Sequence, residues 1–242
     1  PTEEPLGFIR VTSTAWDRLV SVRGHSLPRG LSIEPSGPVW FGALAPGHST
    51  SREVTLRNLL EHTGGLMRDH TEALGAGEDG PEAMVQALNA VGPQTPPGAR
   101  YTYSNTGYAL LALVLERATG HTYSALLENR IVVPAGLEAT TYGVPENPAL
   151  IATGVDMPDL VTRVPVDVTD FRGGLPGASG IFTTAHDLVR FGRALEAGDL
   201  ISPASLEIML AGIPAEGSDG DDAMGWMRVG LGEDAMAWVA SG

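Results

Sequence analysis

The residues best suited to chemistry are Tyr103, Ser104 and Asn105, which directly precede a long apolar run. A phenol can relay a proton, and an asparagine amide can orient a substrate carbonyl or amide. Apolar residues recur at helical spacing up to Gly120, so the triplet is predicted at the mouth of a helix. Two alternatives are a packing role for Tyr103 and a helix N-cap role for Asn105.

The segment 97–120, PGARYTYSNTGYALLALVLERATG, resembles the serine β-lactamase and DD-peptidase superfamily in its class C and esterase-like branch. Three further blocks match in family order, so that the resemblance covers roughly residues 53 to 210. They are VTLRNLLEHTGGL, RIVVPAGLEATTYG and SGIFTTAHDLVRFGRALEAGDLISPASLEIML. The resemblance implies a serine hydrolase that transfers acyl groups from β-lactam, D-Ala peptide or ester substrates. It also implies that Tyr103 and Asn105 are site residues.

The superfamily carries its nucleophile in a Ser-x-x-Lys motif, and the chain departs from that pattern. One alignment places Thr12 and Ala15 at the serine and lysine positions, and a shift by one residue places Ser13 and Trp16 there. The chain has no lysine, because all 15 Lys or Arg residues are arginine. A hydroxyl is a weak nucleophile unless a base touches it. We take Ser13 as the candidate nucleophile, with a turn or cap role as its alternative. Because the lysine is missing, we expect the chain as given to be inactive.

Two hypotheses follow for the function. In the first, the chain is an incomplete serine hydrolase, one domain over residues 1–242 that is truncated at both ends. Residues 1–50 match poorly, and one variant of this hypothesis treats them as a frameshifted translation. In the second, the protein is a pseudoenzyme or binding module that keeps the fold without acylation.

The fold class expected from the resemblance is α+β and β-lactamase/DD-peptidase-like, mainly the helical lobe with an incomplete antiparallel sheet. Periodicity and capping signals predict six helices and a C-terminal hairpin. The helices are expected over 55–62 and 81–91 and after Asn105, Thr122, Thr184 and Ser202, and the hairpin over 225–239. The helix after Asn105 is expected to bury Leu110, Leu111, Val114 and Leu115. The helix after Thr184 is expected to bury Leu188, Phe191 and Leu195, and to begin with a capping box formed by Thr184 and Asp187.

Composition limits the partners. The formal charge of −14 repels phosphate backbones, which argues against nucleic-acid binding, and no apolar run is long enough to span a bilayer. Without cysteine, neither thiolate metal sites nor disulfides are available. We expect no metal and no cofactor, and a small-molecule or peptidoglycan-like substrate. The oligomeric state stays open; the resemblance implies an extracytoplasmic location, periplasmic or secreted, with a cytoplasmic one still open.

Three other candidates receive simpler interpretations. His62 ends its predicted helix and is expected to be a turn residue or a partner of the helix dipole. Ser179 lies in a sequence close to the G-x-S-x-G elbow, but Ile181 replaces the last glycine, which favours a turn. The acidic loop 219–222 lacks the twelfth-position glutamate of a calcium-binding EF-hand and is expected to be solvated.

Overall fold

The structure is a computed structural model, and it describes part of the chain. The described residues are 8–13, 18–23, 52–69, 83–84, 87–88, 91–147, 149, 151–157, 162–166, 175–213, 215–218, 221–230 and 236–239.

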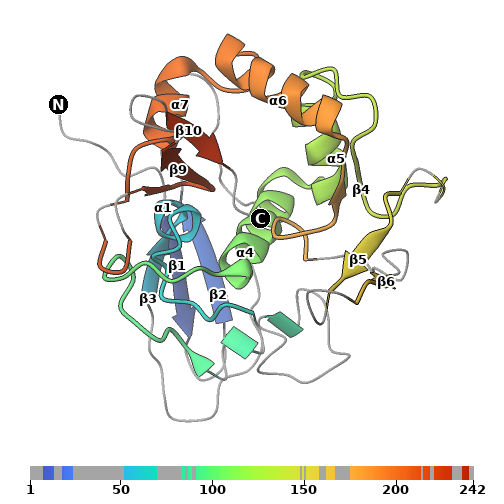
Figure 1. The fold of residues 1–242 in the computed structure, drawn as a ribbon. Coiled ribbons are helices and arrows are strands. Elements are labelled where there is room, and N and C mark those ends of the chain that lie inside the picture. The colour runs from blue at the N-terminus through green and yellow to red at the C-terminus, as the bar shows by residue number, and fades with distance from the viewer. Residues whose placement is uncertain are drawn as a thin grey trace.

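These residues form an α+β fold in which helices and small antiparallel sheets surround the central helix α4 (Figure 1). In chain order the elements are β1 (Phe8–Ser13), β2 (Arg18–Arg23), β3 (Arg52–Thr55), α1 (Leu56–Leu60), α4 (Asn105–Thr119), α5 (Tyr123–Leu127), the π-helical turn η1 (Glu128–Val132), β4 (Thr141–Tyr142), β5 (Gly154–Asp156), β6 (Val164–Val166), β7 (Ile181–Phe182), α6 (Ala185–Ala197), α7 (Pro203–Met209), β8 (Asp222–Ala223), β9 (Trp226–Gly230) and β10 (Met236–Val239).

The strands form two three-stranded and two two-stranded antiparallel sheets among the described residues, in the orders β2-β1-β3, β10-β9-β8, β4-β7 and β5-β6. The β9–β10 pair confirms the predicted C-terminal hairpin, whose Gly232 turn lies outside the described residues. The strands β1 and β2 were not expected, because residues 1–50 show little sustained period. The segment Leu31–His48, for which neither helix nor strand was predicted, lies outside the described residues.

The helix α1 begins at a reciprocal cap. The Thr55 hydroxyl oxygen accepts from the backbone N–H of Asn58 at 3.0 Å, and the Asn58 side-chain oxygen accepts from the backbone N–H of Thr55 at 3.1 Å. This arrangement satisfies two donors that a helix N-terminus otherwise leaves unpaired. The helix is shorter than expected, because it ends at Leu60 with Glu61 as its C-cap, before His62.

The core lies where α1, β3 and α4 meet, and α4 confirms the predicted central helix. Leu59 of α1 is 1% exposed and packs in one cluster with Val54 of β3 and several residues of α4. Leu110 and Val114 of α4 are buried as expected. Leu115 is 39% exposed, because the buried stripe runs through Ala109, Leu110, Ala112, Leu113 and Val114 instead.

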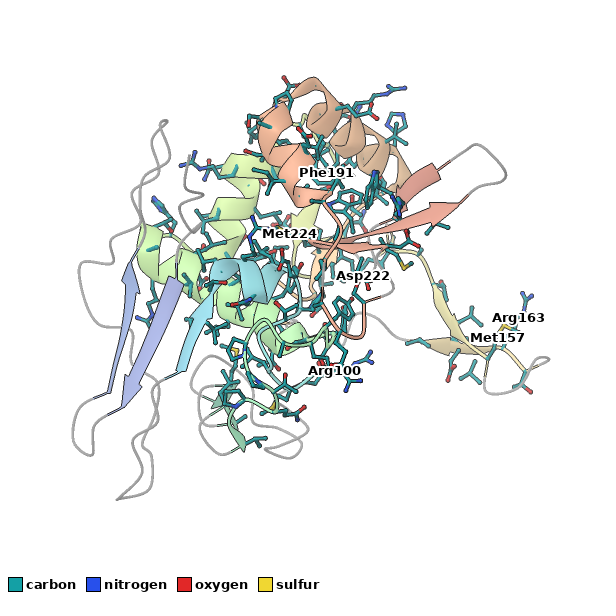
Figure 2. The ribbon with its side chains drawn as sticks, turned by 90° about the vertical axis from the view of Figure 1, so that its left-hand side faces the viewer. Arg100, Met157, Arg163, Phe191, Asp222 and Met224 are labelled. Atoms are coloured by element: carbon teal, nitrogen blue, oxygen red, sulfur yellow. The ribbon has the colours of Figure 1, made fainter. Side chains whose placement is uncertain are left out.

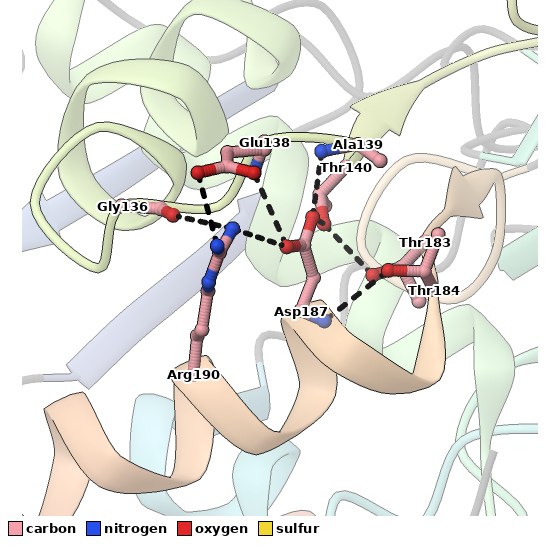
Figure 3. A network of polar contacts seen from close by, with 8 residues as sticks. All are labelled: Gly136, Glu138, Ala139, Thr140, Thr183, Thr184, Asp187 and Arg190. Atoms are coloured by element: carbon pink, nitrogen blue, oxygen red, sulfur yellow. Dashed lines mark hydrogen bonds and ion pairs between the residues drawn. The ribbon is translucent and has the colours of Figure 1, made fainter.

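The buried carboxylate of Asp187 ties α6 to the segment 136–140 (Figure 3). Thr184 caps α6 by accepting from the Asp187 backbone N–H at 3.2 Å, as the predicted capping box requires. The Asp187 side chain does not complete that box. It accepts from the backbone N–H groups of Glu138 and Ala139 and from the Thr140 hydroxyl, at 3.2, 2.7 and 2.8 Å.

This use of Asp187 sets which face of α6 is buried. Ala194 and Leu195 are buried, whereas Leu188, expected in the buried stripe, is 57% exposed. Burial alone would raise the pKa of Asp187. The hydrogen bonds from Ala139, Thr140 and Glu138, together with the charge of Arg190, outweigh burial and hold that pKa below its usual range.

A close contact joins α4 to the loop before β7. A Cβ atom on Gly177 would collide with the carbonyl oxygen of Tyr108 and press on Ala112, and the glycine has a φ of 87°. Only a glycine accommodates both the contact and the backbone angle.

At the other side of the molecule the β5–β6 hairpin projects from the body, with Met157 and Arg163 far from α6 (Figure 2).

Every described ion pair uses a guanidinium as its cation. Surface pairs join Arg57 to Glu61 within α1, Arg228 to Asp221 beside β9, and Arg190 to Glu138 above Asp187, at 2.9, 2.8 and 2.9 Å. The Asp221 contact accounts for part of the acidic loop, whose first two residues lie outside the described residues.

Asp187→Asn should lower the melting temperature at neutral pH, because the amide supplies only one acceptor atom where the carboxylate supplies two. A carboxylate whose folded-state pKa is depressed stabilises the fold above its unfolded pKa, and this contribution is lost as the pH falls through the folded value. The difference between parent and variant should therefore shrink on acidification below about pH 4. Thermal melts across pH measure it.

Asp199→Asn is the matched control, since Asp199 is an exposed carboxylate just beyond the other end of the same helix. An equal loss of melting temperature in both variants would contradict the role assigned to Asp187.

Candidate functional site

The Tyr103 triplet is held against the turn that follows α1. The segment 94–106 runs beside the turn 62–69, and backbone hydrogen bonds connect the two at intervals. The bonds run from Gln94 N to Gly65 O at 2.7 Å, from Gly98 N to Thr63 O at 2.7 Å, from Thr102 N to His62 O at 2.8 Å and from Thr106 N to Arg68 O at 3.1 Å. Two chain segments about forty residues apart are thereby locked in one register at the mouth of α4.

Ser104 is the N-cap of α4, and it binds both sides of this junction. Its hydroxyl accepts from the backbone N–H of Gly107 at 2.9 Å and donates to the carbonyl oxygen of Met67 at 2.6 Å. The residue is 4% exposed. The sequence suggested Asn105 as the cap; in the structure Ser104 takes that position, which leaves the Asn105 side chain to make other contacts.

Asn105 begins α4 and contacts an acidic side chain. Its Nδ2 atom donates to Oδ1 of Asp69 at 2.7 Å. The other carboxylate oxygen of Asp69 lies 3.6 Å from Nε of Arg68, whose guanidinium carbon lies 5.3 Å from the centre of the Tyr103 ring. Arg68, Asp69, Tyr103 and Asn105 therefore form one polar group, which we call the helix-mouth cluster.

His62 is the aromatic neighbour of this cluster. Its ring centre lies 4.6 Å from that of Tyr103 and 4.8 Å from that of Tyr108, and it meets Tyr101 edge-on at 5.7 Å. Its Nδ1 atom accepts from the backbone N–H of Ser104 at 3.1 Å. His62 also has a backbone φ of 55°, which residues other than glycine rarely adopt.

Burial sets the protonation of two rings in this region. It lowers the pKa of His62 to about 4, so the imidazole is neutral at neutral pH and Nδ1 can accept a hydrogen bond. Burial, with the neighbouring phenols of Tyr101 and Tyr103, raises the pKa of Tyr108. The Tyr108 hydroxyl donates to the carbonyl oxygen of Leu60 at 2.9 Å.

A large concavity lies on another part of the molecule. Its volume is about 1620 Å³, and its lining includes Glu138, Thr140, Ser179 and Ile181. Tyr103 and Asn105 are not among the lining residues. Ser179, which the sequence placed in a turn, lies exposed in the loop before β7.

Ser13 is the last residue of β1. Phe8, at the start of β1, pairs with Thr55 beside α1, whereas Ser13 pairs with Arg18 at the opposite end of the strand. Five residues of extended strand span about 17 Å. Its side chain lies outside the described part of the structure, and its role as nucleophile stays a prediction.

Sequence reasoning missed Arg68 and Asp69, because a carboxylate 36 residues before its amide partner leaves no local pattern. It also missed the ring contacts of His62. His62 was predicted to be a turn residue or a partner of the helix dipole, because residue type alone does not reveal its positive φ. Among the described residues, no group of three or more His, Asp or Glu side chains could hold a metal ion. No described helix is long and apolar enough to cross a membrane.

A sequence model of the Beta-lactamase family matches residues 27–242. The match begins after Ser13, and it extends beyond the expected range of roughly 53 to 210 in both directions. Among curated proteins, penicillin-binding protein 4 of Amycolatopsis lactamdurans is 32% identical over 164 residues, which cover 66% of this chain and 42% of that protein. A penicillin-binding protein of Bacillus subtilis is 30% identical over 193 residues, which cover 72% of this chain and 43% of that protein. The chain thus spans less than half the length of these relatives.

Solved structures show the same fold. A D-amino acid amidase of Ochrobactrum anthropi, complexed with D-phenylalanine, superposes with a TM-score of 0.62 at 25% identity, over 76% of this chain and 57% of that one. A D-stereospecific amidohydrolase of Streptomyces superposes with a TM-score of 0.61 at 21% identity, over 97% of this chain and 81% of that one. The second likeness shows the fold alone, and together they support the α+β architecture.

Ser104→Ala should lower the free energy of unfolding by about 2–3 kcal/mol, because it removes a cap and leaves the Gly107 N–H and the Met67 carbonyl without their partner inside the protein. Urea denaturation measures the loss.

The matched control is Ser202→Ala, which removes the exposed N-cap of α7 and should cost about 1 kcal/mol or less. If the two variants lose equal stability, the Ser104 hydroxyl does not join the two segments.

The stability of the protein should fall as the pH is lowered from 6.5 to about 4, because in this window the unfolded chain binds a proton at His62 that the folded chain does not. The contribution of His62 to this fall is at most about 3 kcal/mol. Urea denaturation at several pH values should show a shallower slope for His62→Asn than for the parent.

The exposed His121 provides a control for the pH experiment. His121→Asn should keep the slope of the parent, and a slope unchanged by His62→Asn would show that the His62 imidazole is not held neutral by the fold.

Proposed function

Because the chain belongs to the β-lactamase family of serine hydrolases, we propose that the helix-mouth cluster is the substrate-facing part of an acyl-transfer site. The observation that carries this proposal is the fixed position of Tyr103 and Asn105 at the mouth of α4. Ser104 and the turn 62–69 hold both residues by buried hydrogen bonds. A phenol and an amide at one helix mouth suit an amide or ester carbonyl and its leaving group.

The substrate class follows from the relatives as a proposal. Penicillin-binding proteins and a D-amino acid amidase share the family or the fold. Acyl compounds with a D-configured centre next to the scissile amide are therefore the first substrates to test, together with β-lactams and simple esters. An extracytoplasmic location would suit a peptidoglycan-like substrate.

Acylation in the chain as given meets a chemical obstacle. A serine hydroxyl attacks a carbonyl only when a base removes its proton, and the sequence has no lysine to do so. Arg68 lies over the Tyr103 ring, but a guanidinium stays protonated at any working pH and cannot act as a base. The cluster can therefore orient a substrate without supplying the base that acylation needs.

The second candidate function is a binding module that keeps the substrate-facing residues without catalysis. The bond between Asn105 and Asp69 favours it, because it engages one amide hydrogen of Asn105 with a carboxylate rather than leaving the whole amide for a lysine and a substrate. Covalent labelling by a fluorescent penicillin, applied to the protein expressed from its whole gene, separates the two functions. Labelling excludes the binding module.

The purified chain should not hydrolyse nitrocefin, a p-nitrophenyl ester or D-phenylalanine amide in a Tyr103-dependent way, since losing residues that act as a unit costs several orders of magnitude in rate. Parent, Tyr103→Phe and Tyr123→Phe are compared, because Tyr123 is a half-buried tyrosine outside the cluster. Turnover that only Tyr103→Phe abolishes would overturn the inactive interpretation.

Binding is read separately on the same proteins by calorimetric titration. The proposal expects saturable binding of D-phenylalanine amide or a β-lactam, weakened by Tyr103→Phe and Asn105→Ala and unchanged by Tyr123→Phe. If no variant differs from the parent, the helix-mouth cluster is not the substrate site.

A further inference from the structure

The imidazole of His62 makes two different kinds of contact with the helix mouth. Its faces and edge touch aromatic rings, with the Tyr103 ring tilted by 35° and the Tyr108 ring by 28° relative to it. Its Nδ1 atom accepts from the backbone N–H of Ser104, the N-cap of α4. One side chain thus contacts the residues on both sides of the same peptide bond.

Each contact needs a different property of the side chain. The ring contacts need a planar aromatic surface, which orients a neighbouring ring through offset and tilted stacking. The hydrogen bond needs an unprotonated acceptor near the backbone, and the Ser104 N–H would otherwise be buried without a partner.

The imidazole is itself anchored. The Tyr108 ring stacks on His62 at 4.8 Å, and its hydroxyl is bound to the carbonyl oxygen of Leu60 in the last turn of α1. The His62 carbonyl oxygen accepts from Thr102, one residue before Tyr103. The imidazole therefore cannot shift without breaking contacts to both α1 and α4, and it offers Tyr103 a rigid surface.

We propose that His62 is the positioning residue of the helix mouth, whose ring sets the orientation of Tyr103 and whose Nδ1 atom separately fixes the first turn of α4. This role rests on the proposed function, in which Tyr103 faces the substrate. His62 does not touch the substrate and exchanges no proton with it. Its neutral, buried imidazole suits a role in support rather than in acid–base chemistry.

Two substitutions separate the two contacts. His62→Asn removes the ring but keeps an acceptor close to the Nδ1 position, and asparagine tolerates the positive φ of this residue. His62→Phe keeps an aromatic ring, larger than the imidazole, and removes the acceptor, although phenylalanine fits the positive φ less well than histidine. His121→Asn serves as the exposed control.

The orientation of Tyr103 is read by fluorine NMR of protein labelled with 3-fluorotyrosine. The five tyrosines give five signals, and the Tyr103 signal is the one that disappears in Tyr103→Phe. The first turn of α4 is read by hydrogen exchange at the Ser104 amide. Neither measurement needs a ligand or turnover.

The expected result is a double separation. In His62→Asn the Tyr103 signal moves while Ser104 exchange stays slow, and in His62→Phe the Tyr103 signal stays while Ser104 exchange becomes faster. The signals of Tyr123 and Tyr142, which contact each other elsewhere at 5.2 Å, stay in place in both variants.

An unmoved Tyr103 signal in His62→Asn overturns the proposal. So does a pattern in which signal and exchange change together in both variants, because that is what a merely structural role predicts. If His62→Asn does not fold, His62→Phe decides alone, since a displaced Tyr103 signal there contradicts the role of the ring. Failure of the proposed function appears only in the binding titrations, so the two failures are distinguishable.

Discussion

The described fold depends on the hydrogen bond that the Ser104 backbone N–H donates to the His62 imidazole. It joins the turn after α1 to the first turn of α4, and the neighbouring backbone bonds extend the same junction in both directions. The core forms directly behind it, with Leu59 and Leu110 in one buried cluster. Because burial makes an unpaired N–H costly, the junction fixes the start of α4 and, with it, every residue of the helix mouth.

A second junction, around the Asp187 carboxylate, holds the other half of the described structure. The two junctions use the same physical principle, a buried acceptor that collects backbone donors from a segment distant in sequence. They differ in charge. The imidazole is neutral and therefore tolerates a surrounding of rings, whereas the carboxylate requires several donors and a guanidinium to compensate for its desolvation. Gly177, packed on the backbone of α4, connects the two regions.

Local sequence signals predicted much of this fold, whereas contacts between segments distant in sequence could not be predicted. The caps at Thr184 and Ser202 and the terminal Gly120 all lie where the sequence placed them, because capping chemistry is local. The buried faces predicted for α4 and α6 were partly wrong. Leu115 and Leu188 have the right spacing for burial, but the contacts that orient a helix come from segments whose approach the helix sequence does not encode.

The site shows the same division. Tyr103 and Asn105 could be named from a motif, yet their partners could not, because His62 and Asp69 lie some forty residues upstream. The strands β1 and β2 were missed for another reason, since residues 1–50 show little sustained period and β1 pairs with β3 more than forty residues further along the chain.

The exclusive use of arginine in the described ion pairs makes these links insensitive to amine chemistry. A guanidinium is planar and delocalised, whereas a lysine side chain ends in an amine that can be modified. Reagents directed at lysine amines therefore find no cation to modify in the links between Arg57 and Glu61, Arg228 and Asp221, and Arg190 and Glu138.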